Sequence, residues 1–426
     1  MRTSITTWRQ AALASVLLFA AAVSASAAVP ASADEVIRWN QAATSAAAAA
    51  STDPLTESRV FAILHVCIHD AVNAVDPRYN SYQMHFSAAG NASAEAAVAA
   101  AAHDVLVELL PSGRDLFDRT LEESLKTIVD GVAKTRGLEI GKHAAAAILA
   151  ARKSDGANRS VEYRPGSKPG DYRPTPPDFT PAFMTQWGRI TPFVLQTPAQ
   201  FRPAPHPGVA SAQALRDNEE VKVVGAKEGS VRTDEQSEIA RYWYENSTQG
   251  WNRIAREVSA TRKLNLWENA RFFALVNLAM ADGFIAGFEA KYYYNYWRPA
   301  TAVRESGNDG WLSFLDTPPV PDYPSTHTVL GAAAATVMAR FFGTDFVSFS
   351  TTSGAPYTGI TRRFWSFSEA ARENGASRVL AGIHFSTAVR AGYQQGESVG
   401  SWVFEHALRP VDARPVATQS SRASSR

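Results

Sequence analysis

The chain has 426 residues, which is enough for two or three domains of average size or for one large helical domain. Its 42 lysine and arginine residues nearly balance 41 aspartate and glutamate residues, which leaves a net charge of +1. This balance argues against a general polyanion binder such as a nucleic-acid-binding protein. Any anion chemistry must therefore be confined to a local site.

The first 33 residues have the pattern of an export signal. Arg2 and Arg9 flank a short polar start, the apolar stretch AALASVLLFAAAVSA follows, and small residues stand at positions 31–33. We predict that residues 1–33 are a signal peptide and that the mature chain begins near Asp34. The protein is then expected to be secreted or periplasmic.

Helical patterns dominate the rest of the chain. No stretch shows the alternation of apolar and polar residues that marks a half-buried strand. Alanine-rich or apolar-periodic segments recur instead, so we predict an all-α fold built from helical bundles. These segments are 57–75, 93–110, 138–154, 234–245, 264–297, 327–342, 366–374 and 386–407.

Composition divides the helical chain into two halves. The first spans residues 34–155. Residues 156–210, with YRPGSKPGDYRPTPPDFTP and FRPAPHPG, hold too many prolines to be helical, and aromatic residues such as Trp187 favour an ordered wrap over a flexible linker. The second helical half spans 211–408, and the polar stretch 409–426 is predicted to be a disordered tail.

Two histidines of the first half, His65 and His69, stand one helical turn apart, a spacing that can bind a metal ion. No third ligand accompanies them, so we expect hydrogen bonds within the core. Cys67, the single cysteine, lies between them in an apolar stretch and is expected to be a buried thiol rather than a nucleophile.

The longest apolar run of the mature chain covers residues 272–288. It contains Asn277 and Asp282 and is shorter than the roughly 20 residues that span a bilayer. We therefore expect a buried core helix and no membrane span.

The stretch KYYYNYWRP places Lys291 and Arg298 seven residues apart. On one α-helix this spacing is nearly two turns, so both cations would project from the same face, about 10 Å apart along the axis. Because the residue before a proline is pushed out of the α region, Pro299 predicts that the helix ends near Arg298.

The stretch PDYPSTHTVLGAAAA places Ser325 where a helix of small residues should begin. A serine there is a good N-cap, and the amides of the next residues, Thr326 among them, point outward at the positive end of the helix dipole. Such a helix end binds anions. His327, in the first turn, could pass a proton to or from a bound oxyanion.

The stretch ENGASRVLAGIHFS carries a third pair, Arg378 and His384. We expect Gly375 to end one helix and Gly382 to end the short helical turn that carries Arg378. Ser386 then caps the following helix. Only a helix break would let Arg378 and His384 point at one place, and Gly382 provides it.

Taken in order, these motifs read K-x6-R-P, P-S-x-H and S-R-x5-H. The combination resembles the signature of the superfamily that joins type 2 phosphatidic acid phosphatases (PAP2) and vanadium-dependent haloperoxidases, and RTDEQSEIARYWYE and WNRIAREV are similar to its exported bacterial haloperoxidase branch. The resemblance covers nearly all of the mature chain and implies an all-helical fold of two bundles with an anion held inside one. The residues of the signature are Lys291, Arg298, Pro299, Pro324, Ser325, His327, Ser377, Arg378 and His384.

These residues also suit an oxyanion on physical grounds. Lys291, Arg298 and Arg378 supply positive charges that balance the roughly two to three negative charges of phosphate or vanadate in a dry helical core. The Ser325 hydroxyl and the amides at Thr326 and beyond can bind the remaining oxygens.

The resemblance implies a vanadium-dependent haloperoxidase with vanadate as cofactor. His384 would coordinate the vanadium, His327 would be the acid–base group, and the substrates would be hydrogen peroxide, a halide and a small organic acceptor. The alternative is a soluble exported acid phosphatase that acts on phosphate esters, in which His384 forms a phosphohistidine and His327 protonates the leaving alcohol. A third interpretation is a non-catalytic anion-binding protein.

The sequence departs from the family pattern at two positions within the signature motifs. The third motif normally ends in an aspartate four residues after its histidine, where this chain has Ala388. A backbone carbonyl or another acid, such as Asp234 or Glu397, would have to orient the histidine. Thr326 stands in place of the usual glycine, and its bulk is expected to alter access to the anion. The halide preference and the oligomeric state stay open.

Overall fold

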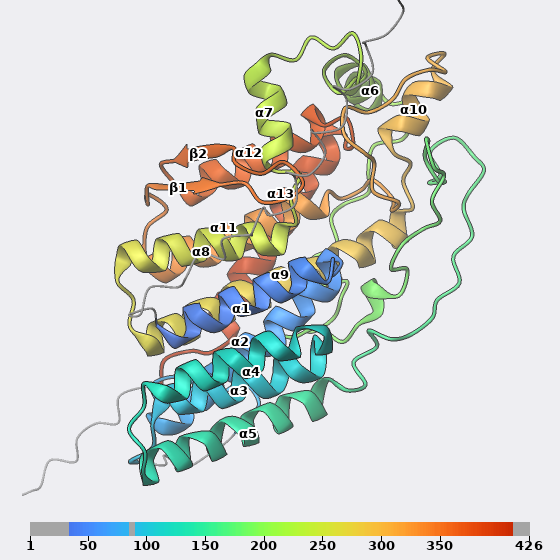
Figure 1. The fold of residues 1–426 in the computed structure, drawn as a ribbon. Helices are drawn as coiled ribbons and strands as arrows, with labels where there is room; N and C mark the ends of the chain where they lie inside the picture. The colour runs from blue at the N-terminus through green and yellow to red at the C-terminus, as the bar shows by residue number, and fades with distance from the viewer. Residues whose placement is uncertain (1–33, 85–89, 412–426) are drawn as a thin grey trace, which may run out of the picture. The chain divides into compact units, whose positions relative to one another are not determined.

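The computed structural model describes residues 34–84 and 90–411, so the predicted signal peptide and nearly all of the predicted tail lie outside the described residues. The fold class is confirmed, because the described residues form thirteen α-helices and a single two-stranded hairpin (Figure 1). The helices are α1 Glu35–Ala49, α2 Pro54–Val75, α3 Ala94–Leu109, α4 Arg114–Lys126, α5 Val132–Arg152, α6 Ala212–Val224, α7 Asp234–Tyr242, α8 Ser247–Arg262, α9 Leu266–Tyr294, α10 Pro299–Glu305, α11 Thr326–Phe342, α12 Phe367–Leu380 and α13 Ser386–His406, with 3-10 turns η1 Pro111–Gly113 and η2 Trp187–Arg189.

The hairpin is the exception that the sequence pattern did not predict. It pairs β1, Phe349–Thr352, with β2, Thr361–Phe364, in antiparallel register. Each strand has four residues, which is too short for an alternating pattern to stand out. Its base is held by the opposed rings of Phe349 and Phe364, whose centroids lie 5.4 Å apart.

Helix α9 is the central element of the fold. A capping box between Asn265 and Glu268 starts it, and every residue from Asn269 to Phe288 is buried. Because it is apolar on all sides, it packs against α2, α11 and α13 at once. The predicted buried core helix is therefore present, and it carries Lys291 near its end.

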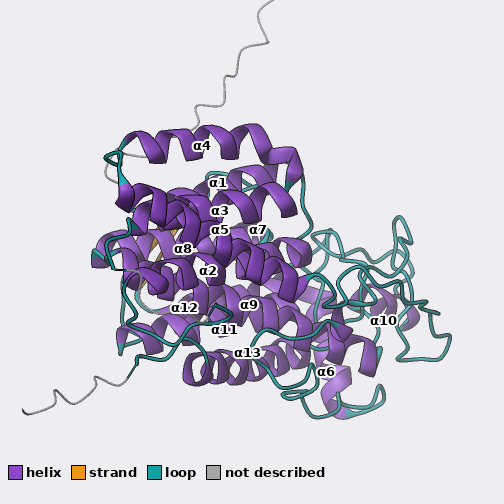
Figure 2. Ribbon diagram, turned by 90° about the horizontal axis from the view of Figure 1, so that it is seen from below, coloured by secondary structure: helices purple, strands orange, loops and turns teal. Residues whose placement is uncertain are grey.

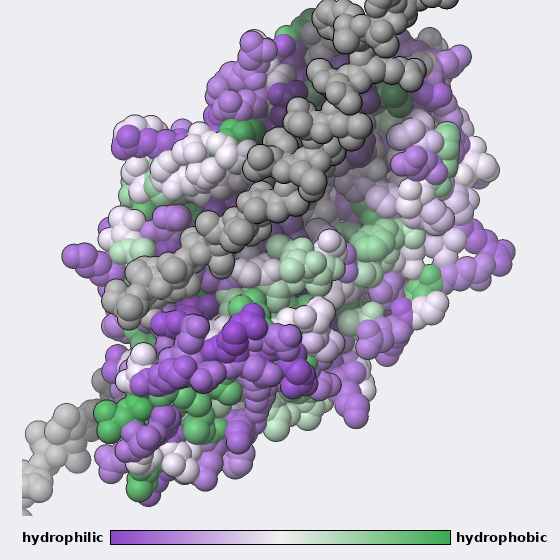
Figure 3. All heavy atoms as spheres, in the orientation of Figure 1, coloured by the Kyte–Doolittle hydropathy of each residue, from purple (hydrophilic) through white to green (hydrophobic). Residues whose placement is uncertain are grey.

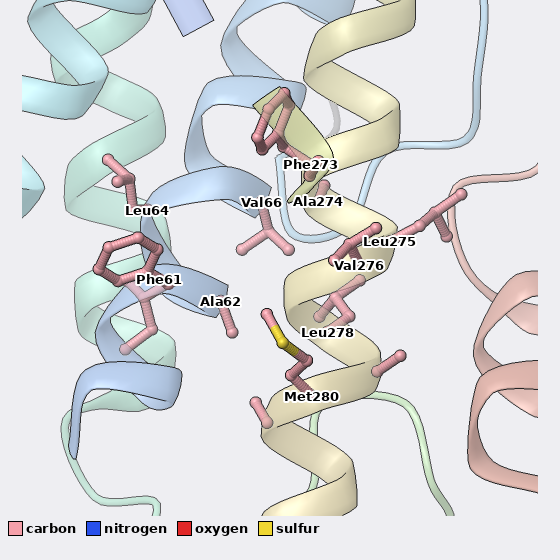
Figure 4. Packing of buried hydrophobic residues seen from close by; sticks show 14 of the residues in the cluster. Phe61, Ala62, Leu64, Val66, Phe273, Ala274, Leu275, Val276, Leu278 and Met280 are labelled. Carbon is pink, nitrogen blue, oxygen red and sulfur yellow. The ribbon is translucent and has the colours of Figure 1, made fainter. Parts of the chain in front are cut away.

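Contacts between α2 and α9 join the two predicted halves, 34–155 and 211–408, into one compact unit that begins at Asp34. In Figure 4, Ala62 and Val66 of α2 point toward Val276 and Met280 of α9. Both helices have the length and apolar composition of a membrane span, but 89% of the apolar window of α2 and 94% of that of α9 is buried. They are core helices of this unit.

The remaining helices lie on either side of this core. Helices α1–α5 gather in the lower part of Figure 1, whereas α6, α7, α10, α12 and the hairpin lie in the upper part. Helices α3 and α5 approach closely because Gly137 and Gly141 face α3 backbone; a Cβ at either glycine would lie 2.4 Å from a carbonyl oxygen. The face in Figure 3 is mostly hydrophilic, with small hydrophobic groups between.

Three glycines on one face of α13 bring this helix against α11. A Cβ at Gly392, Gly396 or Gly400 would lie 2.3–2.6 Å from a backbone oxygen of α11. The spacing of four residues puts all three on one face. The contact at Gly392 is with the carbonyl of Ser325, so this packing fixes the start of α11 against the start of α13.

Residues 156–210 contain no α-helix and follow the outside of the unit, along the right of Figure 1. Figure 2 shows loops gathered on one side, beside α6 and α10. Asp282 of α9 ties this segment down by accepting hydrogen bonds from the amides of Phe193, Val194 and Leu195 at 2.6, 2.7 and 2.9 Å. Burial raises the pKa of Asp282, and these amides oppose the rise.

Candidate functional site

Lys291 and Arg298 do not lie on one helix face, so that prediction is wrong. Helix α9 ends at Tyr294 because Asn295 adopts the left-handed conformation, with φ of 51°, which asparagine tolerates better than most residues. Pro299 is the first residue of α10 rather than a terminator, and Arg298 occupies the N-cap position before it. Both cations are nevertheless buried.

The loop before α11 holds both cations. Lys291 Nζ donates to the carbonyls of Pro321 at 2.7 Å and Asp322 at 3.0 Å. Arg298 Nε donates to the carbonyl of Val320 at 2.7 Å, and its Nη1 donates to the carbonyl of Ile383 at 2.6 Å. These bonds hold the charged ends of Lys291 and Arg298 at the same loop, residues 320–322.

Helix α11 begins at this same loop. Ser325 occupies its N-cap position, but its side chain makes no capping bond; its Oγ instead accepts from Thr328 Oγ1 at 2.9 Å. The first amides of a helix have no acceptor within it, so those that follow Ser325 remain available to an anion. The amide of Ser325 itself donates to the carbonyl of Ala388 at 3.0 Å.

The side chain of Thr326 is accommodated by α9. A Cβ at Gly287 would lie 2.6 Å from the Thr326 methyl carbon, so this methyl group rests over the glycine. The predicted effect of Thr326 on access to the anion is therefore not supported, because the added bulk is directed against α9.

His327 lies in the first turn of α11 and is partly exposed. Its Nε2 lies 3.1 Å from the carbonyl of Trp243 and 3.2 Å from that of Glu245. Carbonyls only accept, so Nε2 carries the proton and Nδ1 is the nitrogen that can receive one. Burial, and next to it Arg378, lowers the pKa of His327 well below its ordinary value, so the ring is neutral.

The break between α12 and α13 occurs at Gly382, as predicted. Gly382 has a φ of +78°, and a Cβ there would lie 2.2 Å from the carbonyl oxygen of Gly225, so only glycine fits. Gly375 does not end a helix; it lies within α12, where a Cβ would approach Val389 to 3.0 Å. Ser386 is the first residue of α13, and Phe385 occupies the N-cap position.

This break brings Arg378 and His384 toward Lys291 and Arg298. Arg378 is buried, and its Nη1 donates to the carbonyl of Trp243 at 3.1 Å, whereas its Nε has no partner among the described residues. His384 Nε2 lies 3.1 Å from Nη1 of Arg298. The structure thus brings His384 within electrostatic reach of Lys291, Arg298, Arg378 and His327. Ser325 and Thr326 directly precede His327 at the start of α11.

Sequence reasoning missed one residue of the site, Asp322. Its Oδ1 lies 2.8 Å from Nδ1 of His384, so the carboxylate at this histidine is neither Asp234 nor Glu397. Since an ionised carboxylate can only accept, Nδ1 carries the proton shared with Asp322. Nε2 is then the acceptor nitrogen, and Nη1 of Arg298 lies 3.1 Å from it and 3.4 Å from Nδ1. An acid within PDYPSTH, five residues before His327, was the available signal.

The site holds more positive than negative charge. Burial, followed by Arg298, lowers the pKa of Lys291 well below its ordinary value and that of Arg378 to about 10. Burial raises the pKa of Asp322 to about 7, although Arg298 and Lys291 oppose the rise. Burial and then the three cations lower the pKa of His384 well below its ordinary value. One carboxylate cannot neutralise three buried cations.

These residues fit a vanadate or phosphate ion. The surplus charge requires an anion, Arg378 Nε is a buried donor without a described partner, and the start of α11 presents backbone amides. The acceptor nitrogen of His384 faces the same centre. Lys291, Arg298 and Arg378 would bind the oxygens, and His384 Nε2 would be the one uncharged ligand for a central atom.

His65 and His69 lie in the core, outside the candidate anion site, and contact core side chains. His65 Nε2 accepts from Asn40 at 2.8 Å, and its ring stacks on Phe273. His69 lies 3.3 Å from Asp70. Within residues 34–84 and 90–411, no group of three or more histidine, cysteine or acidic residues is placed to hold a metal ion. Cys67 is buried, and its sulfur lies 3.8 Å from the carbonyl of Ala101.

Comparisons with known proteins find relatives of the part of the chain that carries these residues. A family model described as the second helical-bundle domain of VCPO matches residues 271–413, which include every residue of the site. The vanadium chloroperoxidase of Curvularia inaequalis is 27% identical over an alignment of 194 residues, and the match covers 32% of this chain and 32% of that protein's length.

Solved structures extend the similarity over most of the chain. The crystal structure of the first bacterial vanadium-dependent iodoperoxidase superposes with a TM-score of 0.79 and 28% identity, covering 89% of this chain and 97% of the other. The apo form of a bacterial vanadium-dependent chloroperoxidase has a TM-score of 0.68 at 19% identity, with 83% and 94% covered, and supports the fold alone.

Proposed function

We propose that this chain, which belongs to the vanadium-dependent haloperoxidase family, oxidises halide with hydrogen peroxide at a vanadate ion held by His384. The observation that carries the proposal is the buried surplus of positive charge around an acceptor nitrogen. Arg298 contacts Nε2 of His384, and the charges of Lys291 and Arg378 also act on this histidine. Among the described residues, Asp322 is the carboxylate that contacts it.

Bound vanadate supplies a Lewis acid that activates hydrogen peroxide, so that halide is oxidised to hypohalous acid while peroxide is reduced to water. The three cations bind the oxyanion and offset its charge in a site where water is scarce. Ser325 and the first amides of α11 orient it. His327, at the partly exposed edge, accepts at Nδ1 the proton that peroxide releases. A small organic acceptor then consumes the product.

Acid phosphatase activity is the second candidate, and the pair of His384 and Asp322 favours it. A histidine whose Nδ1 is held by a carboxylate presents Nε2 as a nucleophile toward phosphorus. In that reaction His327 protonates the leaving alcohol. The same cations serve both reactions, since phosphate and vanadate have the same shape and similar charge.

The response to vanadate separates the two activities. Protein freed of vanadate and phosphate should be inactive with peroxide and bromide or iodide, and should halogenate a phenolic dye once orthovanadate is added. A phosphatase would hydrolyse an aryl phosphate without any addition and would lose that activity to vanadate. His384→Ala should abolish either activity, whereas exposed Arg136→Ala serves as the matched control. Vanadate-inhibited phosphate turnover without halide oxidation would reject the haloperoxidase proposal.

Export is a further part of the proposal. Residues 1–33 are expected to direct the chain to the periplasm or the medium and to be removed there. Amino-terminal sequencing of the native protein from that compartment should begin near Asp34, and a cell-retained chain that begins at Met1 would contradict export.

A further inference from the structure

We propose that Asp322 is the positioning residue of His384, and that it replaces in this chain the aspartate which the family motif carries four residues after the histidine. The inference rests on the proposed function, since it concerns the ligand or nucleophile of that site. The motif position is Ala388, a buried residue without a polar side chain. The carboxylate beside His384 therefore comes from the loop before α11 and not from α13.

The contact of Asp322 with His384 has the geometry of an orienting pair. The Oδ1–Nδ1 distance is 2.8 Å, and both side chains are buried. A carboxylate on Nδ1 fixes the tautomer in which Nε2 has a free electron pair, which is the form required of a ligand. Nε2 then faces Arg298 at the centre of the site.

The backbone of Asp322 is fixed by Tyr296 and by Lys291, one of the residues proposed to bind the anion. Its amide donates to the carbonyl of Tyr296 at 2.8 Å, and its carbonyl accepts from Lys291 Nζ at 3.0 Å. Arg298 Nη1 lies 4.0 Å from Oδ1 of the carboxylate. Asp322 therefore connects His384 to Lys291, which binds its backbone carbonyl, and to Arg298, which lies beside its carboxylate.

A small cavity connects the two alternative positions of the carboxylate. It has a volume of about 10 Å³, which is at the lower limit of the space that one water molecule needs, and is lined by Asp322, Tyr323, Phe385, Thr387 and Ala388 among others. Oδ2 of Asp322 has no hydrogen-bond partner among the described residues. Since Ala388 faces the same cavity, an aspartate there would place its carboxylate beside Asp322. Both positions therefore line one cavity, which is the reason for exchanging the carboxylate between them.

The test is an exchange of the carboxylate between the two positions. Three proteins are compared: wild type, Asp322→Ala, and the double variant Asp322→Ala with Ala388→Asp. Asp309→Ala, at an exposed position after α10, is the matched control. Vanadate and phosphate binding are measured by calorimetry, and the protonated ring nitrogen of His384 is identified by 15N NMR in the ligand-free protein.

We expect Asp322→Ala to weaken vanadate binding about 10- to 100-fold, the usual effect of losing a residue that orients a metal ligand. Phosphate binding, which depends on the cations, should stay equal or become tighter, since a negative charge has been removed. In ligand-free Asp322→Ala, part of the population should carry the His384 ring proton on Nε2 instead of Nδ1. The double variant should recover both the vanadate affinity and the wild-type ring spectrum, and the control should match wild type throughout.

Other results would overturn the proposal. An unchanged ring spectrum and vanadate affinity in Asp322→Ala would show that Asp322 does not position His384. Loss of vanadate and phosphate binding together, with a lower unfolding temperature, would assign Asp322 a structural role instead. The ring spectrum needs no ligand, so it tests Asp322 even if wild type fails to halogenate, a failure that would count against the proposed function alone.

Discussion

Replacing Glu57 by glutamine should stabilise the protein at neutral and alkaline pH. Glu57 lies on α2 with no exposed surface; its Oε2 accepts from Asn246 Nδ2 at 2.7 Å and from Gln249 Nε2 at 3.0 Å, and its Oε1 has no described partner. Burial raises its pKa to about 8. Asn246 caps α8 next to the carbonyls of Trp243 and Glu245 that hold His327.

The direction and size of the effect follow from this pKa. The folded-state pKa of Glu57 lies above the ordinary value of 4.5, so its protonated form contributes to the free energy of unfolding. This contribution is complete below pH 4.5 and is lost as the pH rises through 8. Moving the pKa this far corresponds to about 5 kcal/mol once the side chain is ionised. Glu57→Gln keeps the shape and both accepted hydrogen bonds but cannot ionise. The variant should match wild type near pH 4 and exceed its stability by several kcal/mol above pH 8.

Urea unfolding between pH 4 and pH 9 measures this difference. Exposed Glu139→Gln is the matched control and should follow wild type at every pH. A stability difference between Glu57→Gln and wild type that stays constant over this range would refute the reasoning, because it would mean that Glu57 does not change protonation there.

Three further predictions concern packing around the site. Gly382→Ala should cost about 2 kcal/mol or more and lower anion affinity, whereas Gly310→Ala, where a Cβ meets nothing within 4 Å, should be neutral; equal calorimetric results for the two would contradict the role of the break. Asp282→Ala should cost roughly 3 kcal/mol or more in urea unfolding and speed proteolysis within 156–210, because three amides lose their acceptor; an unchanged cleavage rate would argue against this tie. Gly287→Ala should cost about 1–3 kcal/mol, and Thr326→Ser in the same chain should restore stability by removing the opposing methyl group; no recovery would mean that the two do not collide.

The sequence predicted those features that depend on local spacing. Helical periodicity indicated the fold class and the buried helix over 272–288. The positive φ of Gly382 was predictable, because a glycine between two helical patterns commonly ends a helix. The motif spacing also indicated that Lys291, Arg298 and Arg378 converge, although not by what route.

Features that depend on distant parts of the chain were not predictable. The stretch KYYYNYWRP is compatible with a continuous helix. The helix ends at Tyr294 because Asn295 adopts the left-handed conformation, which the local sequence does not specify. Gly375 was predicted to end a helix, but α12 continues through it. The glycine instead gives room for Val389 of α13, to which a Cβ would approach within 3.0 Å. The contact of Asp322 with His384 joins residues 62 positions apart, so no local pattern could reveal it.

The central claim is that three buried cations hold one tetrahedral oxyanion, and calorimetric titration of the phosphate-free protein with orthovanadate tests it most directly. We expect one vanadate per chain, competition by phosphate, and a loss of about 3 kcal/mol in affinity for both anions in Arg298→Ala and Arg378→Ala, because each removes a buried charge-assisted contact. Exposed Arg136→Ala should bind as wild type does. Absence of binding to wild type, or an affinity in Arg378→Ala equal to that of the Arg136→Ala control, would contradict the claim.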